Sequence, residues 1–352
     1  MVAAGRPERP LRPTIDLIVQ RGLAPAASVA ADLALLARAV TTGRGALRVY
    51  TLAGEVLAIG RYHLPPEPGP DRDVRVMRRH AGGRVAPWGD GFVGLSLVLP
   101  HRAALIASDP AAVRPEQVMN RYLRGLLGAC ESLGVAAFHP GRDTVTVDGR
   151  LLAVGGFEVA ASGGFVLEAV VAVDRDLTVL PSLLDRADPS GVVKAPFVTA
   201  ADTTSLAACT GRRFDVGEIA DGLRSGYERR LGVAFENGTV PECTALDEPA
   251  WLAERCRPES LDRAVTIQGQ LGTVEVFFAR AADALGAVVL AGDFIANSPG
   301  VDRLEQRLAG APAEREALVS RILGVVDGST NFLLGLGTPR AAAAAIADGI
   351  LG

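Results

Sequence analysis

The stretch "VMRRHAGGRVAPWGDGFVGLSLVLP", Val76 to Pro100, decides how the rest of the chain is interpreted. It places Arg78 and Arg79 before the pair Gly82-Gly83, and Arg84 directly after that pair. Glycines let backbone N–H groups approach a ligand closely, and arginines offer fixed forks for carboxylate or phosphate oxygens. The pattern indicates an anion site beside an apolar strand, although a charged, solvated hairpin turn explains the same residues.

Composition limits where such a site can lie. The chain has 352 residues, of which 49% are hydrophobic and 22% charged, which is typical of a globular protein long enough for two domains. Its net charge of −4 gives no global attraction to nucleic acid or anionic membranes, so a basic site must be local. No apolar run reaches the roughly 18 residues of a membrane span. The opening "MVAAGRPERPLRPT" lacks the apolar core of a signal peptide. We expect a cytoplasmic protein without nucleic-acid or membrane partners.

Lysine and cysteine usage narrows the possible chemistry. Lys194 is the only lysine, and it falls on a predicted loop where a solvated surface role is expected. The cysteines show no metal-ligand spacing and are expected to be free thiols in a reducing compartment. Cys130 lies on the apolar face of a predicted helix, which indicates a buried, inert thiol. The other three cysteines are Cys209, Cys243 and Cys256. We therefore predict no metal site built by the protein.

Hydrophobic periodicity predicts alternating helices and strands in the first two thirds of the chain. Helices are expected over 28–40, 115–133, 178–185 and 215–231. Strands are expected over 47–52, 55–62, 74–77, 92–100, 144–147, 150–160 and 165–174. Asp148-Gly149 predicts a type I′ turn between two of these strands.

The composition changes near 235–262, where a linker with one short helix is expected. Three strands follow over 264–270, 273–282 and 284–294, and then helices over 300–309, 313–326 and 338–351. We predict an α+β protein with mixed sheets flanked by helices over 15–240, a linker over 241–262, and a small α+β C-terminal domain over 263–352.

The order of these features resembles the lipoate–protein ligase and biotin/lipoate ligase superfamily. "RRHAGGR" and "SLVLP" match its arginine–glycine signature and the following strand that ends in Ser-x-x-x-Pro. "AADLALLARAV" is similar to its first helix, and "VLAIGRYHLP" to its second strand. "GRDTVTVDGRLLAVGG" is similar to its GRND-x-x-VDG-Lys-Ile segment. "VEVFFARAADALGAVVLAGDF" is similar to its accessory C-terminal domain. The resemblance thus covers nearly the whole chain.

The resemblance implies an activity, its co-substrates and a site. Such a protein uses ATP and Mg²⁺ to convert lipoate or octanoate to acyl-AMP. It then passes the acyl group to a lysine of a lipoyl-domain or H-protein-like carrier, and the small domain closes over the adenylate. Asp143 would contact a nucleotide or metal, or instead cap a strand turn. The residues that the resemblance places against the acyl-adenylate are Arg79, Gly82, Gly83, Arg84, Asp143, Gly155 and Gly156.

Departures from the family pattern concern the catalytic groups. One register puts Leu151 at the family's catalytic lysine and another puts Arg150 there. We favour Arg150, because leucine would leave a buried carboxylate without a cation. Arginine is nevertheless not equivalent to lysine. Trp88-Gly89 replaces a His-Asp pair, so Trp88 would cover an acyl pocket or fill the sheet. His80, inside the turn, would transfer a proton or face solvent.

Three functions follow from this pattern. The first is an active lipoate–protein ligase-like enzyme, in which Arg150 stabilises charge in place of the lysine. The second is a non-catalytic family member that binds lipoyl or acyl-adenylate groups or has a regulatory role, which the departures favour. The third is octanoyltransferase-like acyl transfer. A covalent acyl-enzyme is not expected, because the positions that match the family's cysteines hold none.

Overall fold

The computed structural model describes residues 12–66, 74–195, 198–281, 283–326 and 330–352, and residues 1–11 of the opening segment lie outside this range. A seven-stranded mixed sheet organises the first part of the chain. In spatial order its strands are β10 (Ala234–Asn237), β1 (Thr14–Leu23), β2 (Ala46–Leu52), β6 (Phe92–Leu99), β9 (Phe165–Ala172), β8 (Arg150–Val159) and β7 (Thr144–Val147). β1 runs parallel to both β10 and β2, and the remaining neighbours are antiparallel.

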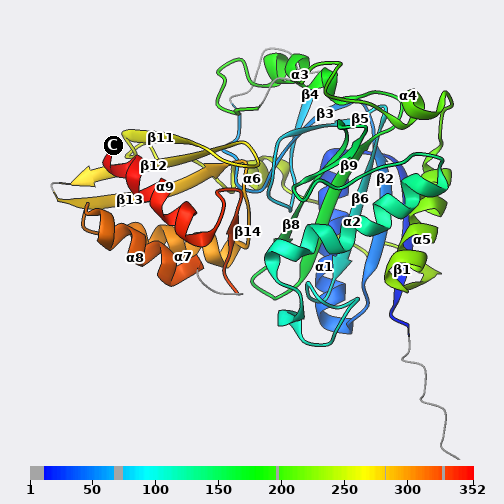
Figure 1. Cartoon of the computed structure of the whole chain (residues 1–352), viewed down its shortest axis with the longest axis horizontal. Coiled ribbons are helices and arrows are strands. Elements are labelled where there is room, and N and C mark those ends of the chain that lie inside the picture. The colour runs from blue at the N-terminus through cyan, green and yellow to red at the C-terminus, as the bar shows by residue number, and fades with distance from the viewer. Residues whose placement is uncertain (1–11, 67–73, 196–197, 282, 327–329) are drawn as a thin grey trace, which may run out of the picture.

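Each face of this sheet is covered by a different layer (Figure 1). Helices α2 (Pro115–Ser132) and α5 (Val216–Leu231) lie on one face and share its largest apolar core. Gly128 faces the backbone of Gly226 where the two helices cross, so the helices approach closely. The other face carries α1 (Pro25–Thr42) and a three-stranded sheet in the order β4 (Val74–Arg78), β3 (Glu55–Ile59), β5 (Ala86–Gly89).

Short helical segments connect these layers. Two 3₁₀ turns occupy Pro110–Ala112 and Leu177–Val179, and α3 (Leu180–Ala187) and α4 (Leu206–Thr210) follow β9. Helix α6 (Glu248–Ala253) lies in the predicted linker. Trp251 of α6 donates its Nε1–H to the carbonyl of Arg78 at 2.9 Å, so this segment is anchored to β4.

The last part of the chain, residues 263–352, forms what we call the small module. Its antiparallel sheet contains β11 (Arg263–Gln268), β12 (Thr273–Ala281) and β13 (Ala284–Gly292). Helices α7 (Ser298–Leu308), α8 (Arg315–Val326) and α9 (Pro339–Leu351) pack against it. A short ribbon of β14 (Ile295–Ala296) and β15 (Leu333–Leu334) faces β8 of the large sheet. Figure 1 shows this module beside the large sheet, close to β8.

The α+β prediction is confirmed, as are the principal helices and strands. Asp148 (φ 49°) and Gly149 (φ 80°) have the positive φ angles of a type I′ turn, as predicted. Strands β1, β5 and β10 were not predicted. None of the helices in the described ranges is long and apolar enough to span a membrane.

Candidate anion-binding site

The glycine turn, Ala81–Arg84, links β4 to β5 and lies directly on β8. A methyl group on Gly156 would come within 2.0 Å of the Gly82 carbonyl oxygen, so only glycine fits at position 156. Gly83 has a φ of 97°, and a methyl group there would lie 3.3 Å from the Gly155 carbonyl oxygen. The structure therefore brings together the two glycine pairs that the sequence predicts for the site.

Two backbone amides of this turn, those of Ala81 and Gly83, already have partners. Ala81 donates its N–H to the buried carboxylate of Glu168 at 2.6 Å, and Gly83 donates to the carbonyl of Phe294 at 2.8 Å. Burial raises the pKa of Glu168. Sequence reasoning missed Glu168, although a single acid within the apolar strand "FVLEAVVA" is a signal. It also missed Phe294, whose contact depends on how the small module docks.

Arg79, between β4 and the turn, is a cation with hydrogen-bonding capacity that no described residue uses. Its side chain is fully buried, and Nη2 donates to the carbonyls of Arg84 at 2.6 Å and Gly82 at 3.3 Å. Its Nε and Nη1 have no hydrogen-bond partner among the described residues. Burial lowers the pKa of Arg79, and the charge of Glu168 opposes this effect. A buried guanidinium with unsatisfied N–H groups is costly, so an anion bound there would be stabilised.

Arg84 and Asp143 form a bidentate ion pair. Arg84 donates from Nε and Nη2 to the two carboxylate oxygens of Asp143, at 2.6 and 2.9 Å. Burial acts to lower the pKa of Arg84, but the hydrogen bond to Asp143 and the negative charges of Asp143 and Asp293 together outweigh it, and the pKa is raised. The backbone of Asp143 also accepts a hydrogen bond from the N–H of Gly155 at 2.7 Å. The positive charge of Arg84 is thus balanced within the protein.

Arg78 has a structural role rather than a place among the anion ligands. Its Nη1 donates to the carbonyls of Arg61 and His63, each at 2.7 Å, and its Nη2 donates to the carbonyl of Leu252 at 2.7 Å. Burial lowers its pKa to about 10. The guanidinium therefore holds the loop after β3 and helix α6 against β4.

The structure does not bring Arg150 to the glycine turn. It begins β8 at the far end of the β7–β8 hairpin, and its side chain is half-buried without a hydrogen bond or ion pair to any described residue. Gly155 lies five positions further along β8, which is about 16 Å along a strand at roughly 3.3 Å per residue. Leu151 is also distant, and its backbone pairs with Asp202 and Thr204. Lys194 is exposed and donates Nζ to the carbonyl of Gly191 at 2.6 Å.

Two residues that flank the turn, one before it and one in β5, lie in the core. His80 is buried, with Nε2 3.1 Å from the carbonyl of Val29, so it does not face solvent. Trp88 fills the space between the two sheets and stacks on Tyr50 at a centroid distance of 6.0 Å. Their side chains belong to the packing that supports the turn.

A buried network joins the small module to the glycine turn. Glu158 of β8 accepts hydrogen bonds from the Tyr62 hydroxyl at 2.7 Å and from the backbone N–H of Ser298, the first residue of α7, at 2.6 Å. Burial raises the pKa of Glu158 to about 7. His63 Nε2 lies 3.0 Å from Asp293 Oδ1. These contacts keep Phe294 on the turn.

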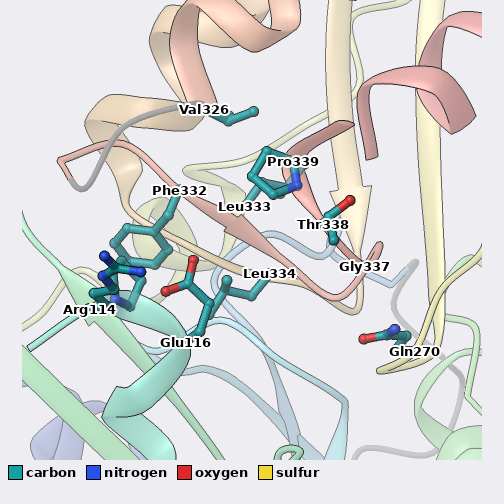
Figure 2. Close-up of a pocket in the computed structure, with 11 residues that line it drawn as sticks. Arg114, Glu116, Gln270, Val326, Phe332, Leu333, Leu334, Gly337, Thr338 and Pro339 are labelled. Atoms are coloured by element: carbon teal, nitrogen blue, oxygen red, sulfur yellow. The ribbon is translucent and has the colours of Figure 1, made fainter. Parts of the chain in front are cut away.

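A cleft of about 600 Å³ lies between the start of α2 and the small module, and Figure 2 shows its lining. Phe332, Leu333 and Leu334 form much of its apolar wall. Leu334 pairs with Ile295, whose Cγ1 would lie 3.7 Å from a methyl group on Gly83. The β14–β15 ribbon therefore separates this cleft from the glycine turn.

In the part of the chain that the structure describes, the side chains do not fit a metal ion held by the protein. Within the described ranges, no group of three or more His, Cys, Asp or Glu side chains is placed to coordinate one. Asp143 has both of its oxygens bound to Arg84. A Mg²⁺ ion accompanying a nucleotide would therefore depend mainly on the phosphates and water for its ligands.

Comparison with known proteins gives a clear result for the fold. No family model and no curated relative matches the sequence. The structure of LipL1 from P. falciparum, a complex with lipoate, superposes with a TM-score of 0.69 at 12% identity over 96% of this chain and 99% of that chain. A bipartite lipoate protein ligase from Thermoplasma acidophilum, studied with its E2 lipoyl domain, superposes with a TM-score of 0.52 at 18% identity. The match covers 69% of this chain and 91% of that chain. Lipoate-protein ligase A bound with ATP superposes with a TM-score of 0.50 at 16% identity, and the match covers 69% of this chain and 94% of that chain. The chain has the fold of these ligases.

Proposed function

We propose that the protein activates a carboxylic acid, lipoate or octanoate, with ATP to form an acyl-adenylate. It then transfers the acyl group to a lysine of a lipoyl-domain or H-protein-like carrier in the cytoplasm. The observation that carries the proposal is the buried Arg79, whose Nε and Nη1 have no partner among the described residues, at a glycine turn. Because the chain shares its fold with solved lipoate–protein ligases, we propose that this cation binds the reacting acid and nucleotide.

The chain contributes electrostatic stabilisation fixed in advance of the reaction. Arg79 contacts the carboxylate of the acid and the α-phosphate, where negative charge gathers as the mixed anhydride forms. Asp143 fixes Arg84, and the carbonyl of Arg84 in turn holds Arg79 Nη2. Gly156 lets the glycine turn pack directly on β8, and Gly155 packs against β9, so both glycines support the turn from below. The N–H of Gly83 becomes available once the Phe294 carbonyl moves away. No step in this scheme requires a metal ligand or a nucleophile from the protein.

Pyrophosphate exchange with ATP tests adenylation directly. We expect exchange that depends on added acid, measured with lipoate, octanoate and biotin, and a loss of about 10- to 100-fold in Arg79→Gln, because a hydrogen bond to a charged group contributes roughly 1.5–3 kcal/mol. Arg213→Gln, at an exposed position before α5, is the matched control and should retain full activity. Absence of exchange with all three acids would contradict the proposed adenylation.

A second candidate function is binding of an acyl-adenylate without catalysis. It is favoured by the positions of Arg150 and Lys194, because neither supplies a cation at the turn. Calorimetry with a non-hydrolysable acyl-AMP mimic distinguishes the two. Binding that depends on Arg79, together with absent exchange, would support the non-catalytic function. Acyl transfer from an octanoyl carrier without ATP would support the octanoyltransferase-like alternative.

A further inference from the structure

A groove of about 630 Å³ lies beside the C-terminal ends of α2 and α5, at a distance in sequence from the glycine turn. Its apolar lining consists of Leu127 on α2 and Val135, Ala136 and Ala137 in the following loop. Its polar lining consists of Arg124 and Glu131 on α2 and Arg229 and Arg230 on α5. Figure 1 shows α2 and α5 side by side against the large sheet. We call these eight residues the α2–α5 groove.

The charges of this groove are unbalanced. Glu131 lies 2.9 Å from Arg230 and 3.8 Å from Arg229, so one carboxylate serves two guanidinium groups. Arg124 is exposed and makes no hydrogen bond or ion pair with any residue in the described ranges. Three arginines thus face one glutamate, in a chain whose net charge is −4. The groove is a local positive surface with an apolar floor.

An exposed aromatic ring follows the groove in the sequence. Phe138 follows the groove residue Ala137, and its side chain is 65% exposed. Its backbone is nevertheless fixed, because its N–H and C=O pair with Thr146 of the edge strand β7 at 2.7 and 2.8 Å. Exposed aromatic and arginine side chains on a fixed backbone are typical of residues that anchor protein–protein interfaces.

The groove lies within reach of the glycine turn. Six residues lead from Ala137 to Asp143, the partner of Arg84, and an extended chain spans at most about 3.6 Å per residue. The separation is therefore no more than roughly 22 Å. A folded domain of about 100 residues has a radius of gyration of roughly 13 Å, so one docked on the groove spans this distance.

We propose that the α2–α5 groove and Phe138 form the docking surface for a small folded carrier domain with an acidic surface around its acceptor lysine. This proposal rests on the proposed function, since it identifies the surface that holds the acceptor. The positive rim selects acidic carriers and speeds their association. Phe138 and the apolar floor supply the contact that persists after docking.

Binding of an isolated apo lipoyl domain of net negative charge tests the surface without any need for ATP. We expect Arg124→Glu and Phe138→Ala each to weaken binding about tenfold by biolayer interferometry. Arg213→Glu, an exposed arginine before the N-terminus of α5 and outside the groove, should change it less than twofold. Raising NaCl from 50 to 500 mM should weaken wild-type binding and have little effect on Arg124→Glu. Thermal unfolding of each variant checks that it is folded.

The same variants separate this proposal from the proposed function. Pyrophosphate exchange should be unchanged in Arg124→Glu and Phe138→Ala, while acyl transfer to the carrier falls. If exchange is absent but carrier binding still depends on the groove, the docking surface stands and the ligase activity fails. The docking proposal would be overturned if Arg213→Glu weakened carrier binding as much as the groove variants do. It would also be overturned if carrier binding were unchanged in both Arg124→Glu and Phe138→Ala. An RNA oligonucleotide that binds the groove in preference to the carrier would overturn it too.

Discussion

At the scale of single residues, the three arginines of the quoted stretch have different roles because they have different partners. Arg78 is occupied by backbone carbonyls and Arg84 by the carboxylate of Asp143. Arg79 alone of the three combines complete burial with unsatisfied nitrogens within the described ranges. Sequence indicates a cationic turn, but only the fold shows which cation remains available to a ligand.

Arg150 provides a prediction at this scale. It lies five residues along β8 from Gly155, so Arg150→Ala should leave the affinity for an acyl-AMP mimic within twofold of wild type. Calorimetry measures the affinity, and Arg79→Gln provides the sensitive reference. A tenfold loss in Arg150→Ala would mean that the hairpin moves to the turn when ligand binds, and would restore the role that the resemblance assigns to Arg150.

At the scale of elements, local patterns predicted most helices and strands, because amphipathic periodicity and turn residues are local properties. They failed for β5, "APWG", which is four residues long and contains proline, and for β10, which is equally short. The glycine pairs of the site were predicted from their motifs. Glu168 and Phe294 were not, because they reach the turn from other parts of the fold.

The contact between the glycine turn and β8 gives a second prediction. Gly156→Ala should lower the free energy of unfolding by about 3 kcal/mol, because the added methyl group meets the backbone oxygen of Gly82, which cannot rotate away. It should also abolish binding of the acyl-AMP mimic. Gly324→Ala is the matched control: it lies in α8 with no atom within 4 Å of the new methyl group, and should stabilise by about 1 kcal/mol. Chemical denaturation measures both. If the two substitutions changed the free energy of unfolding equally, the close packing of Gly156 against Gly82 would be contradicted.

The link between β8 and α7 gives a prediction about pH. Burial raises the pKa of Glu158 from 4.5 to about 7, so the folded protein binds a proton that the unfolded chain releases between these values. The free energy of unfolding should therefore fall as the pH rises from about 4.5 to about 7, by roughly 3 kcal/mol at 1.36 kcal/mol per pKa unit. Glu158→Gln should remove this pH-dependent part of the free energy of unfolding. Denaturation at pH 5, 6, 7 and 8 measures it, and parallel pH curves for the two proteins would contradict the assignment.

At the scale of the whole molecule, the small module occupies hydrogen-bonding capacity that a ligand would use. The Phe294 carbonyl accepts from Gly83, and Glu158 holds Ser298 at the start of α7. The two parts of the chain share apolar contacts where they meet at the candidate site: Ile295 and Phe332 belong to the core under the large sheet, and Tyr62 belongs to the core of the small module. Ligand binding at the turn should therefore be coupled to the docking of the small module.

Hydrogen exchange tests this coupling. With a saturating acyl-AMP mimic, we expect faster amide exchange over residues 292–298, because Phe294 gives up its contact with Gly83. Amides of α9, which lie within the core of the small module, should be unaffected and serve as the internal control. Slower exchange over 292–298 in the complex would show instead that the module tightens on the ligand.

The single lysine has a consequence for the proposed formation of acyl-adenylates. Mixed anhydrides react with any nearby free amine, so an enzyme that releases them slowly risks acylating its own surface. Here Lys194 is the only side-chain amine of the chain, and it lies on an exposed loop with its Nζ bound to Gly191. A surface whose positive charges are otherwise carried by arginine would be almost inert to its own activated product, which would leave the carrier's lysine as the preferred acceptor.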